Sequence, residues 1–260
     1  MDQVRANLTN SPTDTDPHRR RGLGAALESK DPDRRSFADY RRFVRDHYDG
    51  LPGALTAVTG IITGHEALAG WLLRPGGFDV RGCKHILDAG CGNGRYTRFL
   101  LEQADPDAVV TAFDYSRRML ARARQRLDSD RPTQVAADLT RLPYGDGVFD
   151  AVVCGWVLEH LPDPRPGLRE LSRVLQPAGK LLLLATEDTL TGALCSRLWH
   201  CRTYNRLELG KACTECGLAV QRELWFSKLH ARLHLGGIIL ELRRESTNHG
   251  DPEGGLNTRV

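Results

Sequence analysis

The chain has 260 residues, of which 40% are hydrophobic, and this is enough for one α/β domain with a sizeable core. Its formal net charge of +3 is too small to indicate a nucleic-acid or membrane partner by itself. No apolar run approaches the roughly 18 residues that a membrane-spanning helix needs, and the first residues lack the apolar core of a signal peptide. We therefore expect a soluble, cytoplasmic protein without a transmembrane segment.

The first 35 residues are rich in Asp, Arg, Asn, Thr and Pro and contain few large apolar side chains. Such a segment cannot offset the entropy lost on ordering, so we predict a disordered arm over residues 1–35. A basic run at residues 18–21 (His-Arg-Arg-Arg) could contact nucleic acid or acidic lipid, but a solvated charged run is the favoured interpretation.

Apolar residues recur at helical spacing from Phe37 to Leu73, which predicts N-terminal helices over residues 36–83. From residue 84 to about 245 the pattern alternates between strand and helix, which predicts a parallel sheet with helices on both faces. The polar, glycine-containing tail at 246–260 is predicted to be disordered. The expected strands are 85–88, 109–114, 133–138, 151–154, 180–185, 218–226 and 237–242, and the expected helices are 95–103, 116–127, 164–174 and 204–216.

A glycine-rich run follows the first expected strand, which ends at Asp88. Glycines at 90, 92 and 94 allow a tight turn and a close approach of backbone to ligand, and the next helix presents its free N–H groups there. A dinucleotide fingerprint would place its third glycine one residue later, where Arg95 stands. The pattern therefore indicates a nucleotide-type cofactor and leaves a dehydrogenase as a remote alternative.

With Asp88 two residues before Gly90, this run resembles the first motif of class I S-adenosylmethionine-dependent methyltransferases. Residues 149–154 and 168–180 also resemble that family, in particular its ubiquinone/menaquinone-type small-molecule enzymes. The resemblance implies a Rossmann-like seven-stranded α/β sheet whose last strand is antiparallel, and S-adenosylmethionine as cofactor. It implies cofactor contacts from the first motif and the end of the fourth strand, namely Asp88, Gly90, Cys91, Gly92, Asn93, Gly94, Cys154 and Gly155.

Two acids end the next two expected strands. Asp114 comes twenty positions after Gly94 and can accept hydrogen bonds from both ribose hydroxyls, and Tyr115 beside it can lie against adenine. The alternative is that Asp114 only caps the following helix, although Ser116 could do so. Asp138, followed by Leu139, can accept the adenine amino protons, and the alternative is a simple turn residue.

His160 lies just after the fourth expected strand, on the rim where open α/β sheets place ligands. It is a candidate general base, because the ordinary pKa of histidine suits proton transfer near neutral pH. The alternative is a helix-packing role, which histidine has in many relatives at this position.

The seven cysteines are scattered, so we expect reduced thiols. Cys213 and Cys216 form a C-x-x-C near Cys195, His200 and Cys201, but zinc spacing is specific only when two such pairs repeat. We predict that both cysteines belong to a helix that closes on Gly217, and we predict no metal.

Acceptor-defining segments in this family lie in the N-terminal helices and at residues 187–205. Their candidate pocket residues, which equally suit surface or core positions, are Tyr40, His47, Tyr48, His65, Glu187, Trp199, His200 and Tyr204. We expect methyl transfer to a small acceptor, with lipophilic and natural-product molecules as candidates and peripheral membrane contact left open. The alternatives are a protein or RNA methyltransferase guided by the basic arm and a non-catalytic, cofactor-binding regulatory protein. The sequence does not indicate the acceptor or the oligomeric state.

Overall fold

The structure is a computed structural model, and it describes residues 36–50, 64–199, 201–225, 232 and 237–245. The side chains of Cys195, Leu198 and Trp199 are also outside what it describes. The predicted disordered arm, its basic run and the whole predicted tail at 246–260 lie outside the described residues.

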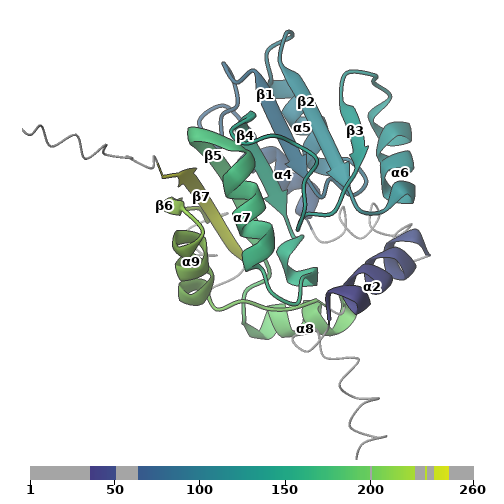
Figure 1. Cartoon of the computed structure of the whole chain (residues 1–260), viewed down its shortest axis with the longest axis vertical. Coiled ribbons are helices and arrows are strands. Elements are labelled where there is room, and N and C mark those ends of the chain that lie inside the picture. Colours follow the sequence, from purple (N-terminus) through teal and green to yellow (C-terminus); the bar gives the residue numbers. More distant parts are fainter. Residues whose placement is uncertain (1–35, 51–63, 200, 226–231, 233–236, 246–260) are drawn as a thin grey trace, which may run out of the picture.

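Seven strands form one sheet in the order β3-β2-β1-β4-β5-β7-β6 (Figure 1). β7 pairs antiparallel with both of its neighbours, whereas the other pairs are parallel. The predicted Rossmann-like sheet with an antiparallel last strand is therefore confirmed. The strands are β1 (His85–Ala89), β2 (Val109–Asp114), β3 (Thr133–Ala136), β4 (Phe149–Gly155), β5 (Leu175–Ala185), β6 (Leu218–Glu223) and β7 (Ile238–Arg244).

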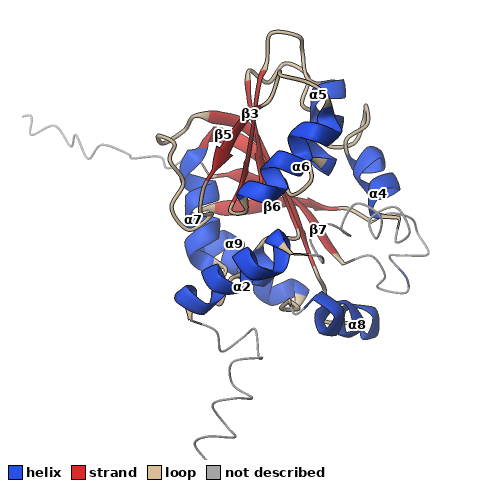
Figure 2. Ribbon diagram, turned by 90° about the vertical axis from the view of Figure 1, so that its right-hand side faces the viewer, coloured by secondary structure: helices blue, strands red, loops and turns tan. Residues whose placement is uncertain are grey.

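Helices cover both faces of the sheet (Figure 2), as predicted. Among the described residues the predicted helices form, although some ends differ by one or two residues, and residues 51–63 of the predicted N-terminal helical segment lie outside the described part. Ser36, Ser116 and Asn205 cap three of the helices through their side-chain oxygens. In the described ranges the helices are α2 (Phe37–Asp49), α4 (His65–Leu72), α5 (Arg95–Gln103), α6 (Arg117–Leu127), α7 (Arg165–Val174), α8 (Leu190–Trp199) and α9 (Arg206–Glu215), together with the 3₁₀ turn η2 (Leu158–His160).

Alternation along the strands divides the core between the two faces of the sheet. Ile86 and Val153 pack in the cluster that contains residues of α4 and α5. Leu87 and Val152, their chain neighbours, pack in the cluster that contains residues of α7 and α9. Successive side chains of a strand point to opposite faces, so a strand covered on both faces is apolar at every position. The apolar runs in the sequence have this origin.

β2 has its predicted bounds, and β1, β4 and β7 differ from theirs by one or two residues. The differences at β3, β5 and β6 have structural reasons or consequences. β3 ends at Ala136, so Asp138 does not end a strand as predicted but lies in the turn that follows. β5 begins at Leu175, five residues before the predicted start, and β6 ends at Glu223. The early start of β5 follows from pairing of Leu175 with Phe149 across a register shift, a long-range contact that local periodicity does not encode.

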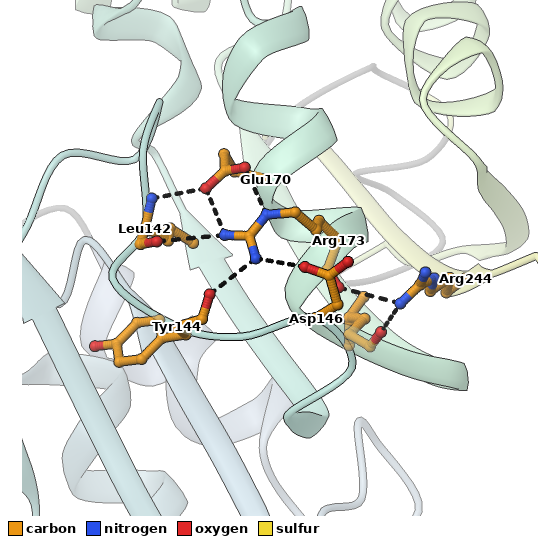
Figure 3. Close-up of polar contacts among 7 residues, drawn as sticks. Leu142, Tyr144, Asp146, Glu170, Arg173 and Arg244 are labelled. Atoms are coloured by element: carbon orange, nitrogen blue, oxygen red, sulfur yellow. Dashed lines mark hydrogen bonds and ion pairs between the residues drawn. The ribbon is translucent and has the colours of Figure 1, made fainter.

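The loop between β3 and β4 is held by Arg173 of α7 (Figure 3). The Arg173 guanidinium donates to both carboxylate oxygens of Glu170 at 2.7 Å and to the carbonyl oxygen of Tyr144 at 2.8 Å. Asp146 accepts a further hydrogen bond at 2.8 Å, and Glu170 in turn accepts one from the backbone N–H of Leu142. This network fixes the loop that follows Leu139.

The described part of the chain contains no helix that is both long enough and apolar enough to cross a membrane.

Candidate functional site

A cavity of about 820 Å³ opens beyond the carboxyl ends of β1, β2 and β4. Chain order in the sheet reverses between β1 and β4, and open α/β sheets bind ligands at such a point. Nine of the predicted site residues line this cavity: Gly90, Cys91, Gly92, Asn93, Asp114, Tyr115, Leu139, Gly155 and His160. Four others are not among the lining residues: Asp88, Gly94, Asp138 and Cys154.

The glycine-rich loop forms one wall of the cavity. Gly90 has φ of +72°, and a Cβ there would lie 2.4 Å from Val157 Cγ2, so this position requires glycine. Gly92 has φ of +54°, and a Cβ there would meet only the terminal methyl of Met119, at 3.5 Å. Gly94 is the N-cap of α5 and supplies no side-chain cap, and Arg95 and Tyr96 of the first turn line the cavity.

Asp114 connects the end of β2 to the glycine-rich loop. Its carboxylate accepts a hydrogen bond from the backbone N–H of Gly92 at 2.8 Å and another from Ser116 N–H at 2.8 Å. Burial raises the pKa of the Asp114 carboxyl to about 6. The Ser116 hydroxyl caps α6 by accepting from Met119 N–H, so the interpretation of Asp114 as the cap of that helix is wrong.

Asp88 lies away from the cavity lining and is 1% exposed. One carboxylate oxygen accepts a hydrogen bond from the Thr97 hydroxyl, which joins β1 to α5. The other oxygen has no hydrogen-bond partner among the described residues. Burial raises the pKa of this carboxyl to about 7. Asp88 is thus placed to support the wall of the cavity from behind.

Asp138 is also outside the cavity lining. Its carboxylate accepts from the backbone N–H and the hydroxyl of Thr140, as an acid at the start of a turn does, and it pairs with Arg41 Nε at 2.8 Å. The next residue, Leu139, is buried and lines the cavity. The backbone after β3 therefore reaches the site, although the Asp138 carboxylate is engaged elsewhere.

On the opposite side, the end of β4 and η2 bring Trp156, Glu159 and His160 to the cavity. Glu159 is 2% exposed, with one oxygen bonded to the Thr186 hydroxyl and the other without a hydrogen-bond partner among the described residues. Burial raises the pKa of Glu159 to about 8. His160 Nε2 lies 2.7 Å from the hydroxyl oxygen of Tyr48 on α2.

Four of the candidate acceptor-pocket residues line the cavity, namely Tyr40, Tyr48, His65 and Glu187. His47 and Tyr204 are not among the lining residues, whereas the Trp199 side chain and His200 lie outside the described part of the structure. The cavity also receives Thr191, Gly192 and Leu194 from α8, a helix that the sequence analysis did not predict.

Sequence reasoning also missed Glu66 of α4. Its carboxylate pairs with Arg95 at 3.4 Å, with Arg98 at 2.8 Å and with Arg126 at 2.6 Å. Arg126 also donates to the Asn93 side chain at 3.0 Å, so α4 is tied to the glycine-rich loop. No sequence signal could have grouped these residues, because they come from three helices.

Cys213 is buried in α9, Cys216 is its C-cap and Gly217 follows with φ of +76°, as the helical interpretation predicted. All cysteines whose side chains the structure describes are free thiols. Within the described ranges, no group of three or more His, Cys, Asp or Glu residues could hold a metal ion.

Residues 87–183 match the family model of the methyltransferase domain. The chain is 34% identical to the demethylmenaquinone methyltransferase of Shouchella clausii over 113 residues, which are 42% of this chain and 48% of that protein. It therefore spans about half the length of this curated relative.

Two solved structures share the fold at low sequence identity. Magnesium protoporphyrin IX methyltransferase from Synechocystis, solved with bound S-adenosylhomocysteine, has a TM-score of 0.54 at 22% identity and covers 70% of this chain and 84% of its own. The [4+2]-cyclase SpnF has a TM-score of 0.54 at 22% identity and covers 69% of this chain and 80% of its own. These likenesses concern the fold alone.

The sheet order and the match over residues 87–183 make this part of the chain similar to class I methyltransferase domains, whose cofactor is S-adenosylmethionine. The cavity fits that cofactor, because Asp114 brings a carboxyl group to its lining beside the glycine-rich loop. The open space at Gly92 also leaves room for a ligand against the backbone. The glycine-rich wall of the cavity is held together by the protein's own hydrogen bonds.

Proposed function

We propose that this protein is an S-adenosylmethionine-dependent methyltransferase that acts on a small, lipophilic acceptor. The observation that carries the proposal is the pairing of Asp114 with the backbone N–H of Gly92 at the edge of the cavity. This contact sets an acid at the end of β2 beside a glycine wall that a ligand can approach closely.

The cofactor-binding residues are proposed as follows. The Asp114 carboxylate accepts the ribose hydroxyls with the lone pairs that its two backbone donors leave available, and Tyr115 and Leu139 pack against the adenine. The first turn of α5, which reaches the cavity at Arg95 and Tyr96, receives the carboxylate of the methionyl group. Asp88, Gly94, Asp138 and Cys154 support this wall from behind.

The size and lining of the cavity support a small acceptor. Ligand pockets usually measure about 300–1,000 Å³, and at about 820 Å³ this one has space for a cofactor and a second molecule. Aromatic side chains from α2 and from the chain just after β4 and just after β6 line it, namely Tyr40, Tyr48, Trp156 and Trp225. The named relatives act on demethylmenaquinone and on a magnesium porphyrin, which are also ring-containing small molecules.

The bound cofactor supplies an electrophilic methyl group on a sulfonium sulfur. The protein's task is to hold the acceptor atom in line with that group at about 3 Å, because positioning accounts for a large share of such a displacement. His65, whose pKa burial lowers to about 4, is neutral at physiological pH and adds no repelling charge to the cavity.

Two measurements test the proposal. Isothermal titration with S-adenosylhomocysteine should show binding to the wild-type chain, and NAD should give none. Incubation with methyl-labelled S-adenosylmethionine and a cell extract, followed by solvent partition, should place the label in a small-molecule fraction. Label confined to precipitated macromolecules would contradict the acceptor class, and tight binding without any transfer would contradict the activity.

A further inference from the structure

We propose that Tyr48 and His160 form a proton-accepting dyad in the cavity, and that the acceptor presents an ionisable hydroxyl group of the phenol or enol type. This inference rests on the proposed function and names the acceptor chemistry of the same site. It is carried by the short contact between two cavity-lining side chains that come from elements 112 positions apart.

The geometry of the pair suits a proton relay. The Tyr48 hydroxyl oxygen and His160 Nε2 are 2.7 Å apart, and the two rings meet edge to face at 78° with centroids 5.3 Å apart. A phenolic oxygen that donates its proton to an imidazole nitrogen keeps lone pairs with which it accepts another hydrogen bond. An acceptor hydroxyl in the cavity can therefore donate to Tyr48 while Tyr48 donates to His160.

The end of α2 that carries Tyr48 is anchored to α6. Arg122 donates to the carbonyl oxygen of Tyr48 at 2.8 Å, and Arg118 donates to the carbonyl oxygen of Asp49 at 2.8 Å. The Ser116 hydroxyl donates to the Asp49 carboxylate as well. On the other side, the ring of Phe43 lies 6.2 Å from the ring of His160. The dyad is thus held in place without a ligand.

The surroundings make His160, and not Tyr48, the final proton acceptor. Burial raises the pKa of Tyr48 well above its ordinary value, and the nearby Glu159, Cys201, Asp114 and Tyr40 raise it further. Tyr48 therefore cannot store negative charge and must lose its own proton as it gains one. An imidazole nitrogen at hydrogen-bond distance can take that proton near neutral pH.

The proposed step is balanced in atoms and charge. The acceptor O–H bond breaks and its proton passes to Tyr48 Oη, while the Tyr48 proton passes to His160 Nε2. The freed electron pair forms the new bond to the methyl carbon of the sulfonium donor, and the sulfur–carbon bond breaks with its electrons left on sulfur as a thioether. The positive charge leaves sulfur and appears on the imidazolium, so the net charge of the cavity is unchanged.

This balance explains why the acceptor should be acidic. An amine attacks with its own lone pair and needs no base in the step, whereas a hydroxyl must lose its proton. Phenols and enols ionise far more readily than aliphatic alcohols, so a neutral tyrosine–histidine relay is sufficient for them. The apolar, aromatic lining of the cavity suits a conjugated ring at this position.

The test uses 4-nitrophenol, which becomes yellow on ionisation, added to the full chain saturated with S-adenosylhomocysteine. Visible absorbance is followed from pH 5 to 9. We expect the bound phenol to ionise at least one pH unit below the free compound, which is a tenfold gain in the ionised fraction. Tyr48→Phe and His160→Gln should each abolish this shift.

Tyr144→Phe and His85→Gln serve as matched controls, since neither residue lines the cavity, and both should keep the shift. Thermal unfolding identifies a variant that does not fold, in which case the other dyad variant carries the test. If S-adenosylhomocysteine fails to bind the wild-type chain, the proposed function fails. If it binds but 4-nitrophenol does not bind, binds only in its neutral form, or keeps its shift in both dyad variants, the dyad is overturned and the proposed function stands.

Discussion

Replacing Arg173 with methionine should destabilise the fold by releasing the loop between β3 and β4. Methionine keeps most of the aliphatic length of the side chain but removes all of its hydrogen bonds. Glu170 then loses its two-point ion pair, and the carbonyl oxygens of Tyr144 and Leu142 lose their donor. The pair is only partly solvated, since the two side chains are 30% and 18% exposed.

A hydrogen bond to a charged group is worth about 1.5–3 kcal/mol, and the contacts of one side chain do not add fully. The contact with Asp146 adds little, because that carboxylate is 75% exposed. We therefore expect Arg173→Met to lower the free energy of unfolding by roughly 2–4 kcal/mol. For a chain of this size, the melting temperature should fall by roughly 5–10 °C.

Urea titration followed by circular dichroism measures the loss, and a double-mutant cycle with Glu170→Gln isolates the pair. Arg165→Met is the matched control on the same helix, because its ion pairs are exposed and longer, at 3.4 and 3.5 Å. The control should cost no more than about 0.5 kcal/mol. Equal losses for Arg173→Met and Arg165→Met would refute the reasoning.

Three further predictions concern the wall of the cavity. The folded-state pKa of Asp88 is raised to about 7, so ionisation of its carboxyl lowers the free energy of unfolding as pH rises from about 4 to about 7. In urea titrations, the free energy of unfolding of Asp88→Asn relative to that of the wild type should rise by about 1 kcal/mol or more between pH 5 and pH 7.5, and a difference that does not change with pH would contradict this. Gly92→Arg should abolish S-adenosylhomocysteine binding in calorimetry, whereas Gly92→Ala should retain it, because the added methyl would meet only Met119, at 3.5 Å. Equal affinities of the two variants would show that the glycine-rich loop does not contact the ligand. Glu66→Gln should weaken S-adenosylhomocysteine binding about tenfold, a loss of roughly 1.4 kcal/mol, because the ion pair that holds Arg126 against Asn93 is lost. An unchanged affinity would show that α4 does not support the loop.

Local patterns predicted most of the sheet because each strand encodes its own burial. The run from Ile86 to Ala89 is apolar apart from Asp88, as a strand covered on both faces must be. Glycines with positive φ at 90, 92 and 94 likewise mark the cofactor loop, since the requirement is local to each residue. Ser116 as a helix cap followed from its place before Arg117.

The sequence alone therefore determined the order of the strands along the chain, most of the helices and the loop that faces the cavity, because these depend on neighbours within a few positions. Only the tertiary structure decided that Arg41 engages Asp138, that Glu66 gathers three arginines, and that Tyr48 meets His160. Those contacts join residues between 29 and 112 positions apart. Their partners are fixed by how helices pack across the sheet, and no periodicity in the chain records that packing.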